Sequence, residues 1–124
     1  MNQIIAIAAG GARCSVSRYG MSTGVYTLLG RSFPYGTLAV NVLGSLLMGF
    51  LYVMLIERLA SSAEMRAVLL IGFLGSFTTF STFSMETLTL LEQAEIAKAA
   101  LNILMSVLLC LAATWAGINF ARIL

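Results

Sequence analysis

The stretch GFLGSFTTFSTFS, residues 72–84, is the part of the chain from which its fold is best interpreted. Four of its thirteen residues are Phe and six carry hydroxyls, although the surrounding sequence is apolar enough for a membrane. Glycines permit a helix to break, and Ser and Thr side chains can satisfy the backbone groups that a break frees. The pattern therefore predicts a membrane helix that is discontinuous near the bilayer centre, with Gly72, Gly75, Thr78 and Thr79 at the break.

The composition of the whole chain indicates a membrane protein. Of its 124 residues, 60% are hydrophobic and 10% are charged, whereas a soluble domain carries roughly 25% charged residues. A transmembrane helix needs about 20 apolar residues, so the chain can hold four helices with short loops in one domain, residues 1–124. The net charge of +2 comes from scattered residues, which does not indicate a nucleic-acid-binding surface.

Four transmembrane helices are expected, and the first is the least apolar. They cover approximately residues 3–29, 37–56, 67–91 and 99–120. The loops GRSFPYG, LASSAEM and EQAEIAK join them in that order. Because loops this short make neighbouring helices antiparallel, both termini should lie on one side of the membrane.

Positive charge is nearly balanced between the two sides of this arrangement. Arg58, Arg66 and Arg122 lie on the side of the termini, and Arg31 and Lys98 lie on the other. Positively charged loop residues set the orientation of a membrane protein, so this balance is compatible with a single topology or with insertion in both orientations. Insertion in both orientations would permit an antiparallel homodimer, which reproduces with two chains what inverted repeats do in one.

Small residues within the predicted helices are expected to serve packing. Pairs four positions apart let helices approach closely in lipid, and the chain has three: Gly20 with Gly24, Ser45 with Gly49, and Gly72 with Ser76. The two cysteines, Cys14 and Cys110, are far apart and form no zinc-binding or redox spacing. They are interpreted as small apolar core residues.

Polar side chains inside the predicted helices are the first functional candidates, because they are costly to bury in lipid. Asn41 either bonds a neighbouring helix or donates to a species that passes through the protein. Arg13 and Arg18 stay charged at ordinary pH, so each either pairs with Glu86 or a helix C-terminus, or lines a water-filled cavity that attracts anions. Glu86 either relays protons or sits near the membrane interface.

The fourth predicted helix carries a polar stripe. Asn102, Ser106 and Thr114 are spaced by four and eight residues, which places them on one face. Such a stripe either packs on another helix or lines a path.

The aromatic residues of the opening stretch fall into two groups. Phe73 and Phe77 are expected to face lipid or to pack in the core, whereas Phe80 and Phe83 share a helix face among hydroxyls. Aromatic ring edges are positive, so ring edges and hydroxyl donors together can contact an anion. They carry no full counter-charge, and weak, repeated coordination is what conduction requires.

Three segments, GGARCSVSRYG, FPYGTLAVNVLGSLLMGF and GFLGSFTTFSTFSMET, together resemble the Fluc family of small bacterial fluoride channels. The resemblance covers the first three predicted helices and, more faintly, the fourth. It implies a passive channel, not an enzyme, that exports cytoplasmic fluoride across the bacterial inner (cytoplasmic) membrane and so gives fluoride resistance. It also implies an antiparallel, dual-topology homodimer with two fluoride pores.

The resemblance further implies roles for individual residues. Phe80, Phe83 and Asn41 would contact fluoride, Arg18 would line a vestibule, and Glu86 matches an acidic position near the pore. A hydroxyl track would comprise Thr37, Ser81, Thr82, Ser84 and Ser106. A structural sodium ion at the dimer centre would be held by the backbone carbonyls of Gly75 and Ser76.

The chain departs from the family pattern at two places. Arg13 and Cys14 stand where the family usually has an apolar residue and Gly, so the chain carries an additional arginine there. Asn102 stands where the family often has Tyr, on the fourth predicted helix.

Other functions are weighed against the same residues. A small dual-topology multidrug/proton antiporter would need a membrane-buried carboxylate near the start of the chain, where this chain has arginines. A structural subunit of a larger complex would not need the alternation of Phe and hydroxyl residues. A membrane hydrolase fits poorly, because the chain has no His to act as a base.

Overall fold

The structure is built from helices. A computed structural model describes residues 2–59 and 62–124, and no β-strand occurs within these two ranges. Three helical segments of this described part are long and apolar enough to cross a membrane: Tyr35–Arg58, Ala63–Glu92 and Ile96–Ile123. The prediction of an all-α protein with membrane-spanning helices is confirmed at this level.

The first helix, α1 (Asn2–Leu29), is 28 residues long. It carries Arg13 and Arg18 together with many small residues, which makes it less apolar than the other long helices, as predicted. It ends at Gly30, whose φ of +85° lies in the left-handed region and whose N–H bonds the Tyr26 carbonyl at 2.9 Å. Glycine adopts this conformation without steric cost, so the chain can turn sharply there.

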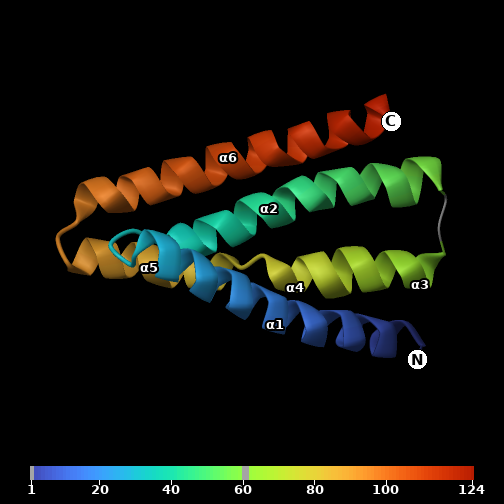
Figure 1. Ribbon diagram of the computed structural model, residues 1–124, viewed down its shortest axis with the longest axis horizontal. Coiled ribbons are helices and arrows are strands. Elements are labelled where there is room, and N and C mark those ends of the chain that lie inside the picture. Colours follow the sequence, from blue (N-terminus) through green and yellow to red (C-terminus); the bar gives the residue numbers. More distant parts are fainter. Residues whose placement is uncertain (1, 60–61) are drawn as a thin grey trace.

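The second long helix consists of α2 (Tyr35–Tyr52) and the π-helical η1 (Val53–Arg58). It begins directly after Pro34, whose carbonyl accepts a hydrogen bond from the N–H of Leu38 at 3.1 Å. The helix runs antiparallel to α1, and both chain ends lie at the same end of the bundle (Figure 1). The prediction that the termini share one side is therefore borne out for the arrangement of the helices.

The third long helix is interrupted, as predicted. The segments α3 (Ala63–Arg66), η2 (Ala67–Leu74) and α4 (Gly75–Phe77) follow one another without a gap, and α5 (Phe80–Glu92) resumes the helix after two residues. These two residues are extended: Thr78 has φ −81° and ψ 152°, and Thr79 has φ −146° and ψ 122°. Figure 1 shows the interruption between α4 and α5.

Two predicted loops are shorter in the structure. Helix α3 begins at Ala63, inside the expected loop of residues 59–65, because the Ser62 hydroxyl accepts a hydrogen bond from the N–H of Met65 at 3.2 Å and caps the helix. Residues 60 and 61 of that loop lie outside the described residues. Helix α6 (Ile96–Ile123) begins inside the expected loop of residues 92–98, because Ala94 turns the chain with φ +61°.

Glycines place the helices close together, which confirms the packing role predicted for Gly72 and contradicts its predicted place at the break. A Cβ atom at Gly72 would lie 2.9 Å from the Ile7 carbonyl oxygen, and one at Gly10 would lie 2.7 Å from the Val68 carbonyl oxygen. Gly72 and Gly75 are helical rather than part of the break. Gly72 is therefore needed for the contact between α1 and η2, because any larger residue would push the two backbones apart.

A second close contact joins α2 and α6. A Cβ atom at Gly49 would collide with the Thr114 carbonyl, and one at Gly117 would collide with the Leu46 carbonyl. The Thr114 hydroxyl adds a hydrogen bond to the Ser45 carbonyl at 3.2 Å. Ser45 and Gly49 on α2 thus lie at a close helix contact, as predicted, and Gly117 on α6 adds to it.

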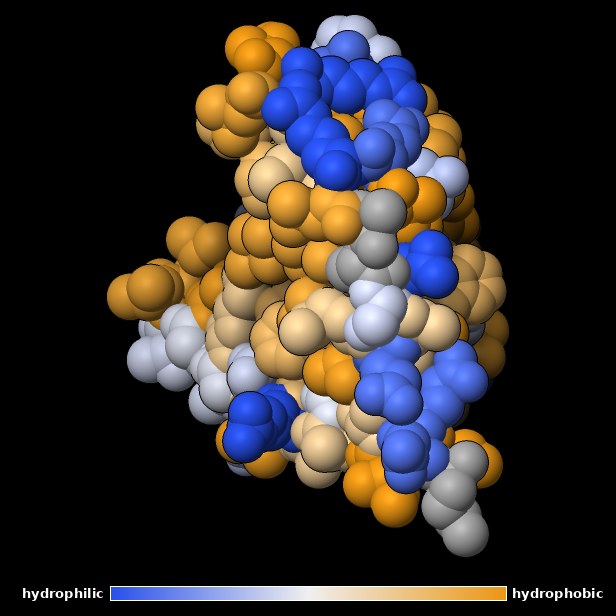
Figure 2. Space-filling model, turned by 90° about the vertical axis from the view of Figure 1, so that its right-hand side faces the viewer, coloured by the Kyte–Doolittle hydropathy of each residue, from blue (hydrophilic) through white to orange (hydrophobic). Residues whose placement is uncertain are grey.

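Polar contacts join two helices at the end of the bundle that holds both termini. Figure 2 looks at this end and shows separate hydrophilic patches among hydrophobic residues. Arg122 Nη2 lies 2.9 Å from Glu57 Oε1, and Arg58 Nη2 donates to the Arg122 carbonyl at 2.6 Å. These contacts join the end of η1 to the end of α6.

Candidate functional site

The interruption of the third helix is closed by the side chain of Asn41 on α2. Asn41 Oδ1 accepts a hydrogen bond from the N–H of Thr79 at 2.9 Å, and Asn41 Nδ2 donates to the carbonyl of Thr79 at 3.2 Å. The side-chain amide thereby bonds both backbone groups of Thr79, as a neighbouring β-strand would do for an extended residue. Of the two interpretations of Asn41, a bond to a neighbouring helix is the one the structure contains. An amide nitrogen carries two hydrogens, so one remains after this pairing.

The hydroxyl of Thr79 begins the next helix. Its Oγ1 accepts a hydrogen bond from the N–H of Thr82 at 3.4 Å, which caps α5. It also lies 3.2 Å from Ser81 Oγ and donates to Thr82 Oγ1 at 3.3 Å. Three hydroxyls therefore cluster at the start of α5, and Thr79 was not among the predicted site residues. Its position directly before a helix is the signal that could have identified it.

A hollow of about 270 Å³ lies beside the break, and we call it the central hollow. Four of the predicted pore residues come from three helices to line it: Asn41 from α2, Phe80 and Phe83 from α5, and Ser106 from α6. The rest of its lining is Ser45, Thr78, Thr79, Val107 and Cys110. The structure thus brings together amide, hydroxyl and aromatic groups that are up to 65 residues apart in sequence.

The four phenylalanines divide between the core and this hollow, as predicted. Phe77 is buried with Cys14 and Val40, and Phe73 packs against this cluster. The centroids of the Phe80 and Phe83 rings are 5.4 Å apart, with the rings inclined at 44°. An inclined pair does not stack face to face. Phe80 is 78% exposed within the single chain.

A second hollow, of about 450 Å³, contains Arg18, and we call it the arginine hollow. Two predicted track residues, Thr37 and Thr82, also line it, together with Thr79, which lines the central hollow too. Arg18 Nη1 donates to the Ser76 carbonyl, in the short helix α4, at 3.3 Å. Arg18 therefore matches both interpretations: it bonds a carbonyl near the C-terminus of a helix, and it lines a cavity as a cation.

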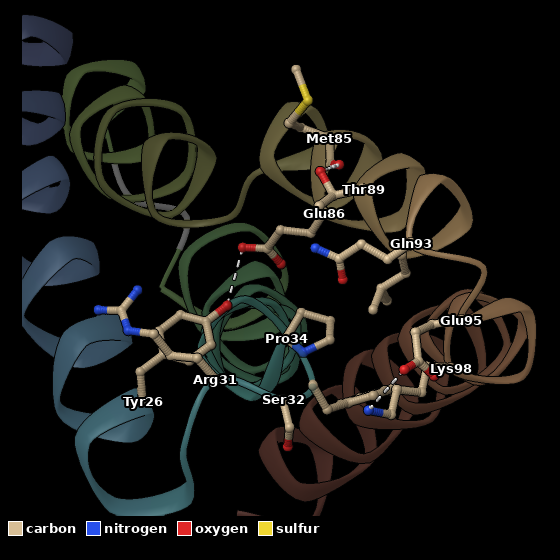
Figure 3. Close-up of a pocket in the computed structure, with 12 residues that line it drawn as sticks. Tyr26, Arg31, Ser32, Pro34, Met85, Glu86, Thr89, Gln93, Glu95 and Lys98 are labelled. Atoms are coloured by element: carbon tan, nitrogen blue, oxygen red, sulfur yellow. Dashed lines mark hydrogen bonds and ion pairs between the residues drawn. The ribbon is translucent and has the colours of Figure 1, made fainter.

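Glu86 lies in a third hollow, of about 410 Å³, shown in Figure 3. Its Oε1 accepts two hydrogen bonds, from the Thr37 hydroxyl at 2.8 Å and from the Tyr26 hydroxyl at 3.1 Å. Its Oε2 is buried without a hydrogen-bond partner. The Arg31 guanidinium stands over the Tyr26 ring, 4.9 Å from its centroid. Tyr26 and Arg31 line both this hollow and the arginine hollow.

Some residues lie elsewhere than the sequence suggests. Cys110, interpreted as a core residue, lines the central hollow. Tyr26, which holds Glu86, was missed because a single Tyr on a long helix carries no distinctive spacing. Ser81 and Ser84 are exposed and line none of the three hollows, and Arg13 is exposed on α1.

Metal binding by side chains has no support in this arrangement. Within residues 2–59 and 62–124, no group of three or more His, Cys, Asp or Glu side chains is placed to hold a metal ion.

Comparisons with known proteins identify the family of the chain. A family model described as "CrcB-like protein, Camphor Resistance (CrcB)" matches residues 5–118. A protein of Geobacter sulfurreducens named fluoride-specific ion channel FluC is 55% identical over 122 residues, which are 98% of each chain. One of Pseudoalteromonas translucida with the same name is 49% identical over 113 residues, 91% of this chain and 94% of that protein.

A longer relative shares the same name. The fluoride-specific ion channel FluC of Methylococcus capsulatus is 59% identical over 119 residues, or 96% of this chain. These residues are 52% of that protein, so this chain spans about half the length of that relative.

Proposed function

This chain belongs to the CrcB family, and on that premise we propose that it is a passive, fluoride-selective channel that lets cytoplasmic fluoride leave the cell. The observation that carries the proposal is the central hollow, where the amide of Asn41, the hydroxyl of Ser106 and the rings of Phe80 and Phe83 meet beside a helix break. The similar proteins are named as ion channels, and a channel needs no catalytic residue.

The groups around the hollow suit a small anion. Fluoride is strongly hydrated, so a selective path must replace its water with hydrogen-bond donors. Asn41 keeps one amide hydrogen after pairing with Thr79, and hydroxyls line the hollow. Positive ring edges add weak attraction, and the absence of a full counter-charge from the lining lets the ion move on.

A path is proposed through the three hollows. Arg18 draws anions into the arginine hollow, and Thr79 adjoins both that hollow and the central one. Thr37 joins the arginine hollow to Glu86 through a hydrogen bond. In this path the hydroxyls of Ser81 and Thr82 adjoin that of Thr79, and Ser84 lies one helical turn after Ser81 on α5.

The proposal includes four spanning helices and a second copy of the chain. Helix α1, with 28 residues, is long enough to be the fourth, because about 20 residues cross a bilayer. Ser81, Thr82 and Ser84 are exposed in the single chain, and polar groups facing lipid are unfavourable. A partner in antiparallel orientation would cover these hydroxyls, and the two chains would form two pores. The balanced positive charges of the two sides permit this orientation. The dimer would span the bacterial inner membrane.

A structural sodium ion at the dimer centre is also proposed, and Gly75 fits it better than Ser76. In an unbroken helix the N–H of Thr79 would bond the Gly75 carbonyl, but here it is donated to Asn41. Carbonyls at the end of a broken helix are suitable ligands for sodium. The Ser76 carbonyl already accepts from Arg18, whose positive charge opposes a second cation. Higher thermal stability in sodium chloride than in N-methylglucamine chloride would support the site; equal stability would contradict it.

The alternative of a drug/proton antiporter has no support from the comparisons, in which the similar proteins are named fluoride channels. The charge of the first helix also argues against it, since Arg13 and Arg18 stand where a carboxylate would be needed to bind a cationic drug.

Anion release from liposomes tests the function. Purified protein is reconstituted at low density, and efflux is followed with a fluoride electrode in one sample and a chloride electrode in a matched one. Fast fluoride release with negligible chloride release is expected. No fluoride release from a folded protein, or equal release of both ions, would overturn the proposal.

A further inference from the structure

Asn102 on α6 connects two residues of the proposed pore without lining it. Its side chain is 2% exposed. Nδ2 donates to Thr87 Oγ1 at 2.8 Å, and Oδ1 accepts from Ser106 Oγ at 3.4 Å. Ser106 lines the central hollow, whereas Asn102 and Thr87 do not. The three side chains therefore form a buried chain of hydrogen bonds that ends at the wall of the hollow.

The direction of each hydrogen bond in this chain is fixed by a backbone carbonyl. Thr87 Oγ1 lies 2.8 Å from the Phe83 carbonyl oxygen, which can only accept, so the Thr87 hydroxyl must donate to it. Thr87 Oγ1 can then only accept from Asn102, which turns the amide NH₂ toward α5. The Asn102 oxygen consequently faces Ser106, and Ser106 must donate its single proton to Asn102.

Ser106 differs in its hydrogen-bond partner from several other hydroxyls on the helices. Six of them donate to the backbone carbonyl four residues earlier, at 2.8–3.0 Å: Ser15, Ser17, Thr27, Thr87, Thr89 and Thr114. The residue four positions before Ser106 is Asn102, but Ser106 donates to its side chain, at 3.4 Å, rather than to its carbonyl. Hydroxyl hydrogen bonds are typically about 2.7–2.8 Å long, so this one is weak.

We propose that Asn102 is a positioning residue: it turns the Ser106 hydroxyl away from the helix backbone and holds it in a weak hydrogen bond, which the hydroxyl exchanges for a hydrogen bond to an anion in the central hollow. This inference rests on the proposed channel function and deepens it. A Ser106 hydroxyl bonded to the backbone would be held tightly and would present only lone pairs to an anion. The Thr87 bond keeps the Asn102 amide in place, so the Ser106 hydroxyl turns back to it when the anion leaves.

If Asn102 acts through Ser106, the effects of mutating the two residues are coupled, and a double-mutant cycle can test this coupling. In Asn102→Leu, the Ser106 hydroxyl has only the backbone carbonyl to bond, so the variant should behave like Ser106→Ala. Each single change is expected to slow fluoride efflux about tenfold, the effect of one hydrogen bond to a charged group. The double variant should be about as slow as either single one. A double variant about a hundredfold slower would overturn the proposal, because independent effects multiply.

Thr87 supplies a second test that leaves Asn102 and Ser106 intact. Thr87→Val removes the acceptor that orients the Asn102 amide, so efflux should fall about as far as in Asn102→Leu. Thr87→Ser keeps the hydroxyl and should retain efflux within about twofold of the wild type. Thr27→Val is a matched control, since Thr27 is an exposed helical hydroxyl on α1 bonded only to the Thr23 carbonyl at 2.9 Å. Wild-type efflux in Thr87→Val would contradict the proposal.

A spectroscopic measurement separates this inference from the channel function. In ¹⁵N-labelled protein, the side-chain NH₂ signals of Asn102 are assigned by their loss in Asn102→Leu. They should shift in both Thr87→Val and Ser106→Ala, and should shift on addition of fluoride in the wild type. Unchanged signals in these variants would refute the hydrogen-bond chain. If the wild type released no fluoride while the signals shifted in the variants, the channel proposal alone would fail.

Discussion

Asn41 and Thr79 are joined by two hydrogen bonds that use the side chain of one residue and only the backbone of the other. The donor–acceptor distances are 2.9 Å and 3.2 Å. Without this pairing the N–H and C=O of Thr79 would lack partners inside a membrane, where each unsatisfied group costs several kcal/mol. The interruption of the third long helix is therefore stable because α2 presents an amide at that level.

Substitution of Asn41 should separate its structural role from its contact with the anion. Asn41→Asp keeps an acceptor for the N–H of Thr79 but adds a negative charge, so fluoride efflux should become undetectable while a folded protein is retained. Asn41→Leu loses both bonds and should lower the free energy of unfolding by about 2–4 kcal/mol. Efflux from liposomes and thermal unfolding in detergent measure the two effects. Normal conduction by Asn41→Asp would show that Asn41 is only structural.

The aromatic character of Phe80 and Phe83 should affect fluoride efflux more than the volume of their side chains does. Phe80→Ile or Phe83→Ile keeps an apolar side chain but removes the positive ring edge, so efflux should fall by about tenfold, which corresponds to the upper range of about 1.5 kcal/mol for an oriented aromatic contact. Phe120→Ile is the matched control, because Phe120 is exposed on α6 and lies outside the central hollow. Size-exclusion chromatography verifies assembly. Wild-type efflux in both pore variants would eliminate a role for ring edges.

The two donors to Glu86 should differ in importance. Thr37 is buried and bonds Oε1 at 2.8 Å, whereas the Tyr26 bond to the same oxygen is 3.1 Å long. Thr37→Val should therefore slow efflux more than Tyr26→Phe does. It should also lower the free energy of unfolding more, with the loss in each variant between about 0.5 and 3 kcal/mol. Both variants are measured under identical conditions. The reverse order would mean that the Tyr26 hydroxyl is the stronger partner of Glu86.

Arg18 should act on anions at a distance. Arg18→Met removes the positive charge of the arginine hollow, so efflux should fall severalfold at low ionic strength and less at high ionic strength, because salt shortens the electrostatic reach to about 10 Å at 0.1 M. Arg13→Met, on the same helix but outside the three hollows, is the control. A loss of efflux that does not depend on salt would assign Arg18 to structure, through its bond to Ser76.

The glycines divide into packed and open positions. Gly117→Ala would place a Cβ against the Leu46 carbonyl, so it should destabilise the α2–α6 contact by about 1–3 kcal/mol. Gly20→Ala meets nothing within 4 Å in the single chain and should leave the stability of the chain unchanged. Thermal unfolding compares them. Equal stability of Gly117→Ala and the wild type would show that the two helices can move apart without loss.

The helices, the break and the family could be predicted from the sequence. The side chains that form hydrogen bonds with the backbone groups at the break could be predicted only in part. Thr78 and Thr79 could be predicted at the break because hydroxyls and glycines weaken a helix locally. Close packing at Gly72 could be predicted from its spacing to Ser76, but its partner Ile7 could not, since that contact depends on how α1 packs. Likewise, Asn41 could be identified as a polar residue in lipid, but its partner 38 residues away is set by tertiary packing.

The same limit applies to the site. Phe80, Phe83, Asn41 and Ser106 were predicted from residue type and resemblance, and the structure brings them to one hollow. The direction of the hydrogen bonds among Thr87, Asn102 and Ser106 could not be predicted from the sequence, because it depends on distances between α5 and α6. The bonding of Ser106 to a side chain instead of its own helix could not be anticipated from spacing, which equally allows the backbone bond.

The pairing of a side chain with a backbone also bears on which mutations can compensate for one another. Thr79 contributes only its N–H and C=O to the pair, which every residue except proline possesses. No exchange of side chain at position 79 can therefore restore the pair after Asn41 is lost. In a genetic selection for fluoride tolerance, suppressors of an Asn41 defect should arise at positions that bring another amide to the break, and not at position 79.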